Sequence, residues 1–218
     1  MTILKNEKIK WEERLCVYRA ASEVLNTKIR LVKMEYDCLV QGNNYSEIQM
    51  ISSRIKTTES IANKLEKNGL DFTVENIESR IHDVVGARII CLTLTDVKVF
   101  IELLTNSLNK TEGFKIEKCK DYITNPKESG YQSYHFRILV PVTFSNEIYK
   151  VPAEIQVRTL LMHAWAELEH KMGYKPSEEI LGRNMVRAQF NALAASIEAT
   201  DTMVENIVSE PKVKKICK

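Results

Sequence analysis

Apolar side chains recur every three to four residues in the first 40 positions, which is the spacing of one face of an α-helix. The positions that share this face are Trp11, Leu15, Tyr18, Leu25, Ile29 and Val32. The pattern predicts one long helix over residues 5–40. The run Gly42-Asn43-Asn44 is expected to end this helix, because these residue types favour turns.

Short strands and helices are predicted to alternate after this point. Residues 47–56 are expected to form a strand, and a helix is expected to start at Thr57-Thr58-Glu59-Ser60. The segment GARIICLT (86–93) is a β-rich apolar run. Thr95-Asp96 is predicted to cap the next helix. The apolar stripe of that helix consists of Val97, Phe100, Ile101, Leu104 and Leu108.

Three strands and two helices complete the predicted order. The strands are expected over residues 114–123, 133–142 and 148–158, and the helices over 159–172 and about 180–208. This order predicts an α+β fold with a mixed sheet of about five strands flanked by helices. We expect a single domain with N-terminal helices (1–44), a core (45–175), and a C-terminal helix with a basic tail (176–218).

The last two predicted strands each combine an apolar face with a polar face. Successive side chains of a strand point to opposite sides, so His135 and Arg137 share one face of the first strand. Glu154, Gln156 and Arg158 share one face of the second strand in the same way. Apolar residues occupy the alternate positions of both strands. The pattern indicates the floor of a polar site rather than a plain core sheet.

Composition narrows the class of protein without identifying it. The chain has 218 residues, of which 44% are hydrophobic and 28% charged, and its net charge of +2 gives no strong attraction to nucleic acid. No signal peptide and no apolar run of membrane-span length are recognisable. We therefore expect a cytoplasmic protein with no membrane partner. The five cysteines are scattered and form no CxxC pair, which argues against a zinc or disulfide framework.

The first predicted helix carries an excess of positive charge. Eight basic side chains lie in the first 33 positions, against four acidic ones, and Lys28, Arg30 and Lys33 end this run. Such a run is most often a solvated helix face. The alternative is a docking surface for a polyanion.

A second group of basic residues lies around one predicted strand-to-helix junction. Arg54, Lys56 and Lys64 cluster there, and Arg88 lies on a later strand. The chain has neither a GxxxxGK[ST] nor a GxGxxG loop, so side chains would have to hold any bound phosphates. Arginine forks and lysine ammonium groups suit triphosphate oxygens. Taken alone, this cluster is more often a solvated surface.

Two carboxylates at strand positions are candidates for holding Mg²⁺. Asp83 precedes the strand that begins at Gly86, and Glu154 lies inside a strand. Mg²⁺ usually takes one or two carboxylates together with substrate phosphate oxygens. An aspartate before a strand is usually a cap or turn residue, whereas a glutamate inside a strand is harder to explain structurally. His82-Asp83 also matches the metal pair of HD phosphohydrolases, but the rest of that constellation is not convincing.

The predicted helix over residues 159–172 has a polar stripe formed by His163, Glu167 and His170. The residues expected on its opposite, apolar face are Leu161, Trp165, Leu168 and Met172. The stripe is not an HExxH motif, and a zinc site needs three or four protein ligands. A polar stripe that faces the site is therefore the preferred interpretation.

Five segments together resemble the synthetase domain of the RelA/SpoT family in its stand-alone, small alarmone synthetase form. They are RIKTTESIANKL (54–65), HDVVGARI (82–89), DYITNPKESGYQSYH (121–135), EIQVRT (154–159) and HAWAELEH…YK (163–175). They follow the family order over about residues 45–175. The resemblance implies a nucleotidyltransferase-like synthetase fold and transfer of the β,γ-pyrophosphate of ATP to a ribose 3′-OH.

The resemblance also implies roles for individual residues. The residues implied in ATP binding are Arg54, Lys56, Lys64 and Arg88. Asp83 and Glu154 would hold Mg²⁺, and Glu154 would accept the proton of the 3′-OH. Those implied in acceptor binding are Tyr131, Lys127, His135, Gln156 and His163. Tyr131 would stack on the acceptor base, which fits the strength of base–aromatic stacking.

The sequence departs from the guanosine enzymes of this family at residues that bear on the acceptor. Ser129-Gly130-Tyr131-Gln132 stands where Asn-Gly-Tyr-Arg is common, and His163-Ala164 precedes Trp165-Ala166 where Asp or Asn, then Phe, is common. The HAWAELEH form resembles a subgroup that includes toxic small alarmone synthetases. Some of these modify the 3′-terminal adenosine of tRNA and stop translation, and others make adenosine alarmones.

Two acceptors are therefore expected, with tRNA slightly favoured over GDP or GTP. In the first case the tRNA docks on Lys28, Arg30 and Lys33, and the toxin implies an antitoxin protein as a partner. In the second case the product is a guanosine alarmone, (p)ppGpp. A catalytically silent nucleotide-binding module is a third class, but such a module would be expected to lose Glu154, Asp83 or Tyr131, and all three are present. The sequence leaves self-association into a homo-oligomer open.

Overall fold

A computed structural model describes residues 5–40, 47–145, 147–172 and 180–209 of the chain. Its elements, in chain order, are α1 (Lys5–Leu39), β1 (Ile48–Ile55), α2 (Thr58–Lys67), α3 (Val74–Arg80), β2 (Val85–Cys91), α4 (Leu94–Lys110), β3 (Lys115–Asp121), β4 (Tyr134–Phe144), β5 (Glu147–Thr159), α5 (Leu160–Met172) and α6 (Ile180–Ser209). The predicted order of helices and strands is confirmed. The turn at residues 42–44 and the basic tail lie outside the described residues.

The five strands form one mixed sheet in the order β1-β2-β5-β4-β3. β2 and β5 are parallel, and the other neighbouring pairs are antiparallel. This α+β architecture confirms the predicted fold class. The parallel neighbours β2 and β5 are separated in the chain by α4, β3 and β4. Helix α4 carries the chain across one face of the sheet from β2 to the edge strand β3, and β4 and β5 then return by antiparallel pairing.

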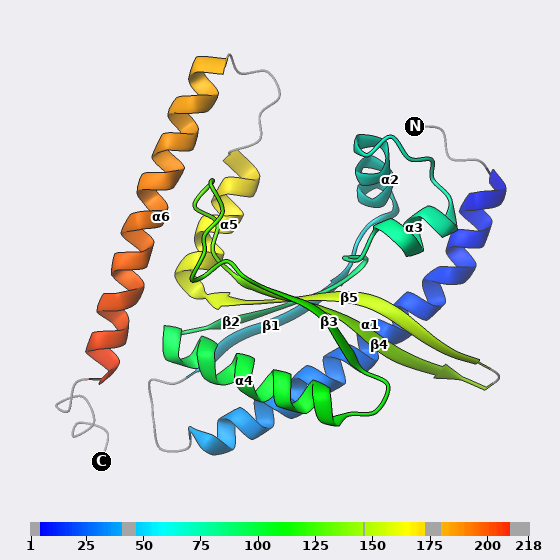
Figure 1. Ribbon diagram of the computed structural model, residues 1–218, viewed down its shortest axis with the longest axis horizontal. Helices are drawn as coiled ribbons and strands as arrows, with labels where there is room; N and C mark the ends of the chain where they lie inside the picture. The colour runs from blue at the N-terminus through cyan, green and yellow to red at the C-terminus, as the bar shows by residue number, and fades with distance from the viewer. Residues whose placement is uncertain (1–4, 41–46, 146, 173–179, 210–218) are drawn as a thin grey trace.

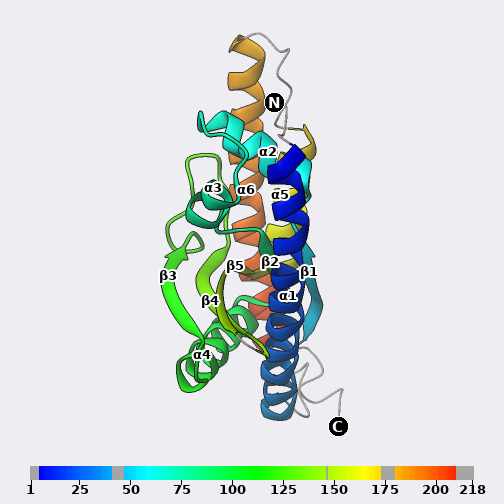
Figure 2. The ribbon, with the colours of Figure 1, turned by 90° about the vertical axis from the view of Figure 1, so that its right-hand side faces the viewer.

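Helices α1 and α4 cover one face of the sheet (Figure 1). The stripe predicted for α1 supplies this layer, because Trp11, Leu25 and Ile29 are fully buried. Phe100 and Leu104 of α4 are fully buried as well. Viewed from the side, α1 passes α3 near its N-terminal end and lies beside α4 near its C-terminal end (Figure 2). The apolar face of the sheet is therefore closed by two helices, and its polar face lies on the other side.

Hydroxyl side chains begin several of the helices. The Thr57 hydroxyl accepts a hydrogen bond from the Ser60 backbone N–H and caps α2. Thr93 and Asp96 form a reciprocal capping box at the start of α4, with both bonds at 3.0 Å. The predicted cap at Thr95-Asp96 is therefore wrong by two residues. Thr93 takes that role because a cap must precede the first helical turn, and Asp96 contributes from the third helical position.

Helices α5 and α6 lie on the polar side of the sheet and are more exposed than the α1 layer. Trp165 of α5 is buried, but Leu168 is 43% and Met172 is 59% exposed, so the apolar face predicted for α5 is only partly correct. The helix rises away from the sheet (Figure 1), so only its first turns can pack against the sheet. Within the described residues, no helix is both long enough and apolar enough to cross a membrane.

A buried carboxylate connects α6 to the end of β5. Asp201 is 2% exposed and accepts a hydrogen bond of 2.8 Å from the Thr159 hydroxyl. Burial raises the pKa of Asp201 to about 6, and the neighbouring Glu205 charge acts in the same direction against the Thr159 hydrogen bond. The ionised form of Asp201 is therefore disfavoured in the folded protein.

We expect Asp201→Asn to stabilise the protein at neutral pH. The raised pKa means that the folded state prefers the protonated carboxyl, so this group's contribution to stability is lost as the pH rises through about 6. Asparagine keeps an acceptor oxygen for Thr159 without the charge. The free energy of unfolding in urea should rise by up to about 3 kcal/mol at about pH 7.5 and by little at about pH 4.

Asp37→Asn is the matched control, because Asp37 is an exposed carboxylate paired with Lys33 on the helix surface. Its effect should stay below about 1 kcal/mol. A difference between Asp201→Asn and the wild type that does not change with pH would contradict the assigned burial of this charge.

Candidate active site

The polar face of the sheet carries two rows of residues that are register partners in neighbouring strands. The first row, from β1 to β3, consists of Arg54, Gly86, Glu154, Arg137 and Lys118. The second row consists of Ser52, Arg88, Gln156, His135 and Lys120. Register partners point to the same side of a sheet, so charged and amide groups from five strands meet on one surface. The alternation of polar and apolar residues in the sequence predicts such a polar face for β4 and β5.

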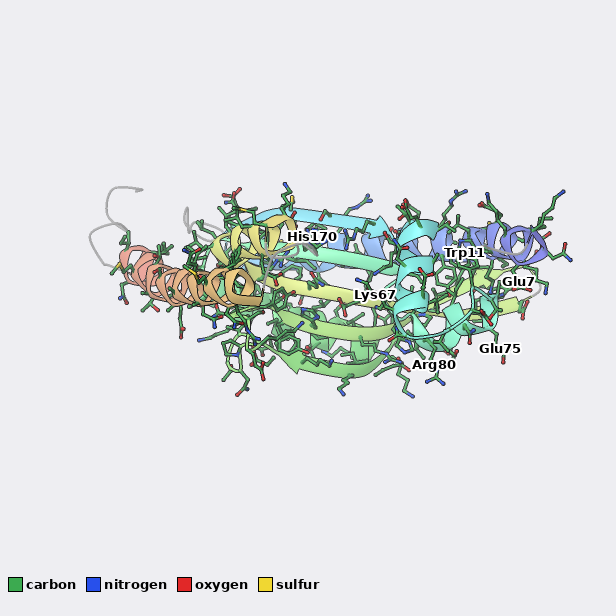
Figure 3. The ribbon with its side chains drawn as sticks, turned by 90° about the horizontal axis from the view of Figure 1, so that it is seen from above. Glu7, Trp11, Lys67, Glu75, Arg80 and His170 are labelled. Carbon is green, nitrogen blue, oxygen red and sulfur yellow. The ribbon has the colours of Figure 1, made fainter. Side chains whose placement is uncertain are left out.

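Helices border this surface at both ends. Figure 3 looks onto it, with α2 and α3 at one end, where Lys67 and Arg80 are labelled, and α5 with His170 at the other. The opposite face belongs to α1 and α4. The polar face of the sheet therefore forms a floor that is bordered by α2 and α3 at one end and by α5 at the other.

Three adjoining pockets lie on this floor and along its α2 wall. The central pocket measures about 200 Å³ and is lined by Ser52, Ser53, Arg54, Asp83, Gly86, Ala87, Arg88, Glu154 and Gln156. The basic pocket measures about 220 Å³ and is lined by Lys64, Arg80, His82, Asp83, Lys118, Lys120, His135, Arg137 and Glu154. The helix pocket measures about 540 Å³, and the polar groups in its lining include Arg54, Lys56, Thr57, Ser60, Lys64, Lys67 and His170.

Shared residues show that the three pockets are parts of one site. Asp83 and Glu154 line both the central and the basic pocket. Arg54 lines the central and the helix pocket, and Lys64 lines the basic and the helix pocket. The two candidate carboxylates thus stand at the boundary between two cavities whose other charged groups are mostly cationic.

Asp83 is held between two lysines. Lys56 donates to one of its carboxylate oxygens and Lys64 to the other, both at 2.8 Å. Burial by itself would raise the pKa of Asp83, but these hydrogen bonds and charges outweigh it and leave the pKa below its ordinary value. Asp83 is therefore an anion at neutral pH, and two ammonium groups are fixed beside it. Lys56 and Lys64, which the sequence places at one strand-to-helix junction, are thus brought together with Asp83 from a later segment.

Glu154 belongs to a chain of polar contacts that leads to Tyr131. The Tyr131 hydroxyl lies 2.9 Å from His135 Nε2, and His135 Nδ1 lies 3.5 Å from a Glu154 oxygen. Gln156 donates to the other Glu154 oxygen at 2.8 Å. Burial would raise the pKa of Glu154, but the contacts with His135 and Gln156 outweigh it, so the pKa is lowered. Glu154 is thus ionised and oriented from both sides.

Tyr131 lies in a cluster of aromatic rings beside this chain. Its ring centroid is 6.2 Å from that of Tyr122, 5.7 Å from His135 and 6.3 Å from Trp165, all in edge-on geometry. The Lys127 ammonium lies over both tyrosine rings, at 4.7 Å from Tyr122 and 4.6 Å from Tyr131. A cation thus stands on the ring faces that an aromatic base would use. Tyr122 is a member of this cluster that the sequence did not indicate.

Arg88 and His163 are each engaged by a charged neighbour. Arg88 forms an ion pair of 2.8 Å with Glu167 of α5. His163 accepts a hydrogen bond of 2.8 Å at Nδ1 from the guanidinium of Arg158, since burial and the charges of Arg158 and Arg88 lower its pKa and leave the imidazole neutral. His163 therefore contacts Arg158 rather than any of the three pockets described above.

Among the residues that the structure describes, the buried cation of Arg158 has no carboxylate partner of its own. It is 2% exposed, and within the described residues its Nε has no hydrogen-bond partner. Burial lowers its pKa to about 10. The nearby Glu167 is already paired with Arg88. The sequence placed Arg158 on the polar face but gave no signal that it would be enclosed, because its burial depends on the packing of α5.

The donor groups fit Mg²⁺ better than zinc. In the described part of the chain, no three His, Cys, Asp or Glu residues converge as a metal cluster, whereas zinc needs three or four such ligands. Asp83 and Glu154 line the same two pockets, and Mg²⁺ commonly takes two carboxylates plus phosphate oxygens. These two residues are the ones that could hold the ion against a bound phosphate chain.

Several lining residues of the basic pocket were not singled out from the sequence. They are Arg80, Lys118 and Lys120, whereas Arg137 was expected on the polar face of its strand and His82 was named only beside Asp83. Lys118 and Lys120 did carry a signal, because alternate lysines in the predicted strand 114–123 share one face. Arg80 carried none, since it ends a short helix whose position depends on its contacts with α1 and α2.

The basic residues Lys28, Arg30 and Lys33 are not brought to this site. They lie on α1, on the face of the sheet opposite to the pockets (Figure 1). Lys28 donates to Thr111 at 2.5 Å, and Lys33 pairs with Asp37. The geometry therefore gives no support to a docking surface that is continuous with Tyr131.

Comparisons with known proteins agree with this geometry. Residues 53–179 match the family described as the region found in RelA / SpoT proteins. GTP pyrophosphokinase YwaC of Bacillus subtilis (strain 168) is 40% identical over 180 residues, which cover 83% of this chain and 82% of that protein. The solved structure of small alarmone synthetase 2 from Bacillus subtilis has a TM-score of 0.74 at 35% identity, covering 90% of this chain and 97% of that one.

A second solved structure is that of small alarmone synthetase 1 from Bacillus subtilis, bound to its product pppGpp. It has a TM-score of 0.73 at 29% identity and covers 91% of this chain and 96% of that chain. The similarity thus extends over both the sheet and its helices.

We expect His163→Asp to stabilise the protein, because it gives the buried guanidinium of Arg158 a counter-charge. His163 already accepts a hydrogen bond from this guanidinium, so the gain comes from the added charge alone. Because a hydrogen bond between two charged groups is stronger than one between a charged and a neutral group, the free energy of unfolding in urea at about pH 8 should rise by roughly 1 kcal/mol. His163→Asn is the matched control, since it offers an acceptor without charge. If the His163→Asp protein is no more stable than the His163→Asn protein, Arg158 is already compensated.

Proposed function

Because this chain belongs to the RelA/SpoT family and is an enzyme of the pyrophosphokinase type, we propose that it transfers the β,γ-pyrophosphate of ATP to the ribose 3′-OH of GDP or GTP. One observation carries this proposal. Asp83 and Glu154 form the common wall of two adjoining cationic pockets. Such a wall suits a reaction in which a donor and an acceptor, both rich in phosphate, meet at one reacting centre.

The donor side consists of the central and helix pockets. Arg54 lines both of them, Arg88 lines the central pocket, and Lys56 and Lys64 line the helix pocket. These side chains come from β1, the junction after it, α2 and β2 rather than from a glycine-rich loop, in keeping with the absence of such a motif. Two guanidinium groups and two ammonium groups offer the charge that a triphosphate needs. We assign this side to ATP.

The acceptor side consists of the basic pocket and the Tyr131 cluster. Lys118, Lys120 and Arg137 would hold the phosphates of the acceptor, and His135 connects them to the tyrosine. Tyr131 would stack on the base after Lys127 leaves its ring face and turns to a phosphate. Stacking on one ring is worth about 1–3 kcal/mol. Gln156 lines the central pocket beside Glu154 and would contact the acceptor from there. His163 would act on the acceptor side through Arg158.

A guanine nucleotide is the acceptor that the relatives favour. YwaC is named a GTP pyrophosphokinase, and small alarmone synthetase 1 was solved with pppGpp. The relatives give no support to tRNA as the acceptor, or to a toxin with an antitoxin partner. The position of Lys28, Arg30 and Lys33 across the sheet also separates the expected tRNA docking surface from Tyr131. The sequence favoured tRNA because of His163 and the basic charge of α1. We therefore replace tRNA by a guanine nucleotide as the proposed acceptor.

The chemistry requires positioning and charge neutralisation more than covalent catalysis. The 3′-oxygen forms a bond to the β-phosphorus of ATP, the bond from that phosphorus to the α–β bridging oxygen breaks, and AMP leaves with the electron pair. Glu154, held by His135 and Gln156, accepts the hydroxyl proton. Mg²⁺ held by Asp83 and Glu154 would neutralise phosphate charge. Lys56 and Lys64 fix the position of Asp83 and add to the positive field.

The acceptor is tested by incubating the protein with ATP labelled in its γ-phosphate, separately with GDP, GTP and deacylated tRNA. We expect label in a guanosine tetra- or pentaphosphate and none in tRNA. Label that enters only tRNA would overturn the proposed acceptor but not the pyrophosphate transfer. Absence of label from all three would overturn the transfer itself.

We expect Glu154→Gln to lower the turnover number by about 10²–10⁴-fold, the usual range for loss of a general base. Glutamine keeps the size of the side chain but cannot take a proton. The unfolding midpoint should change little. Glu102→Gln is the control, because Glu102 is an exposed acid on α4, on the other face of the sheet. Transfer by the Glu154→Gln protein at the wild-type rate would remove Glu154 from its role as base.

A further inference from the structure

The loop of residues 126–132, here termed the acceptor loop, lies against α6. The Asn191 side chain, with its nitrogen facing the loop, donates to the backbone carbonyls of Ser129 at 2.8 Å and Glu128 at 3.2 Å. Arg187, one helical turn earlier, pairs with the Glu128 carboxylate at 2.7 Å. Two side chains from one face of α6 thus hold the turn that directly precedes Tyr131.

Gly130 shows how closely the loop and the helix approach each other. Its φ of +87° lies in the region that favours glycine. A Cβ atom at this position would also lie 2.6 Å from Ala194 Cβ and 3.4 Å from the side-chain amide of Asn191. The turn is closed by a hydrogen bond of 2.8 Å from the Gly130 N–H to the Lys127 carbonyl. The loop backbone is therefore packed directly on the surface of α6.

α6 is itself attached to the rest of the site. Trp165 of α5, whose ring touches Tyr131, donates from Nε1 to the Phe190 carbonyl at 3.0 Å. Further along the helix, Asp201 accepts from Thr159 at the end of β5, and Glu205 accepts from Thr95 at the start of α4. The helix is thus anchored to elements on which Glu154 and the sheet depend. It can therefore serve as a fixed support for the backbone of the acceptor loop.

We propose that Asn191 is a positioning residue for the acceptor, and that α6 acts through it as the brace that sets the acceptor loop and Tyr131 over the basic pocket. The role rests on the proposed function, because it concerns the nucleotide that Tyr131 would stack on. Asn191 contacts the loop backbone and none of the three pockets. Its loss should therefore weaken binding of the acceptor while leaving ATP binding and the chemistry at Glu154 in place.

The test compares Asn191→Ala and Asn191→Asp with Gln189→Ala. Aspartate has the size of asparagine but cannot donate, and it places a charge against the carbonyls. Gln189 is an exposed amide on the same helix two residues earlier. We expect the KM for GDP or GTP to rise roughly 3- to 20-fold in both Asn191 variants, from the loss of two modest hydrogen bonds. The KM for ATP should change less than about twofold, and the control should match the wild type.

Amide hydrogen exchange over residues 126–132 gives a second readout that does not depend on activity. Exchange in this loop should be faster in the Asn191 variants than in the wild type and in the Gln189 variant. Unchanged exchange, or an equal rise of the KM for both substrates, would overturn the positioning role. A wild-type protein that transfers no pyrophosphate to GDP or GTP would overturn the proposed function instead, and exchange would still decide whether Asn191 holds the loop.

Discussion

The site depends on one constraint, which is the register of a five-stranded sheet covered on only one face. Alternation within each strand separates apolar from polar side chains, and α1 with α4 closes the apolar side. The pairing of β2, β5 and β4 then aligns Gly86, Glu154 and Arg137 in one row. A slip of one residue in any of these pairs would send the polar set into the core. The polar rows therefore keep their alignment only while the apolar core on the opposite face of the sheet holds the strands in register.

Charge is the second organising feature of the molecule. Two carboxylates, Asp83 and Glu154, stand among lysines, arginines and histidines that outnumber them in the pockets they share. Asp83 is paired with two lysines, and Arg158 is buried with a neutral histidine as its contact. Like cations held close together repel one another, so the positive surplus destabilises this surface until an anion binds. Phosphate-rich substrates relieve that repulsion, which couples binding to the stability of the floor.

Much of the site could be predicted because its residues follow local periodicities. Strand alternation places Glu154, Gln156 and His135 on polar faces. Lys56, Lys64 and Asp83 are recognisable in the sequence as charged residues beside strands, although only the fold shows that they contact one another. Arg80 and Tyr122 were missed because each reaches the site through packing between elements. Lys28, Arg30 and Lys33 were expected near the acceptor, yet the sheet lies between them and Tyr131. The sequence reveals that a helix is basic, but it does not reveal which face of the sheet that helix packs against.

The sequence by itself determined the order of elements, the α+β class and the faces of the strands, since these follow from spacings of two and of three to four residues. It also carried the motifs that identify the family. The tertiary structure alone decided which rows meet across the sheet, that α1 closes the face opposite to the pockets, and that α6 rests on the acceptor loop. Those contacts join residues dozens of positions apart, such as Asn191 and Ser129. No local pattern encodes them, because they depend on how whole elements pack.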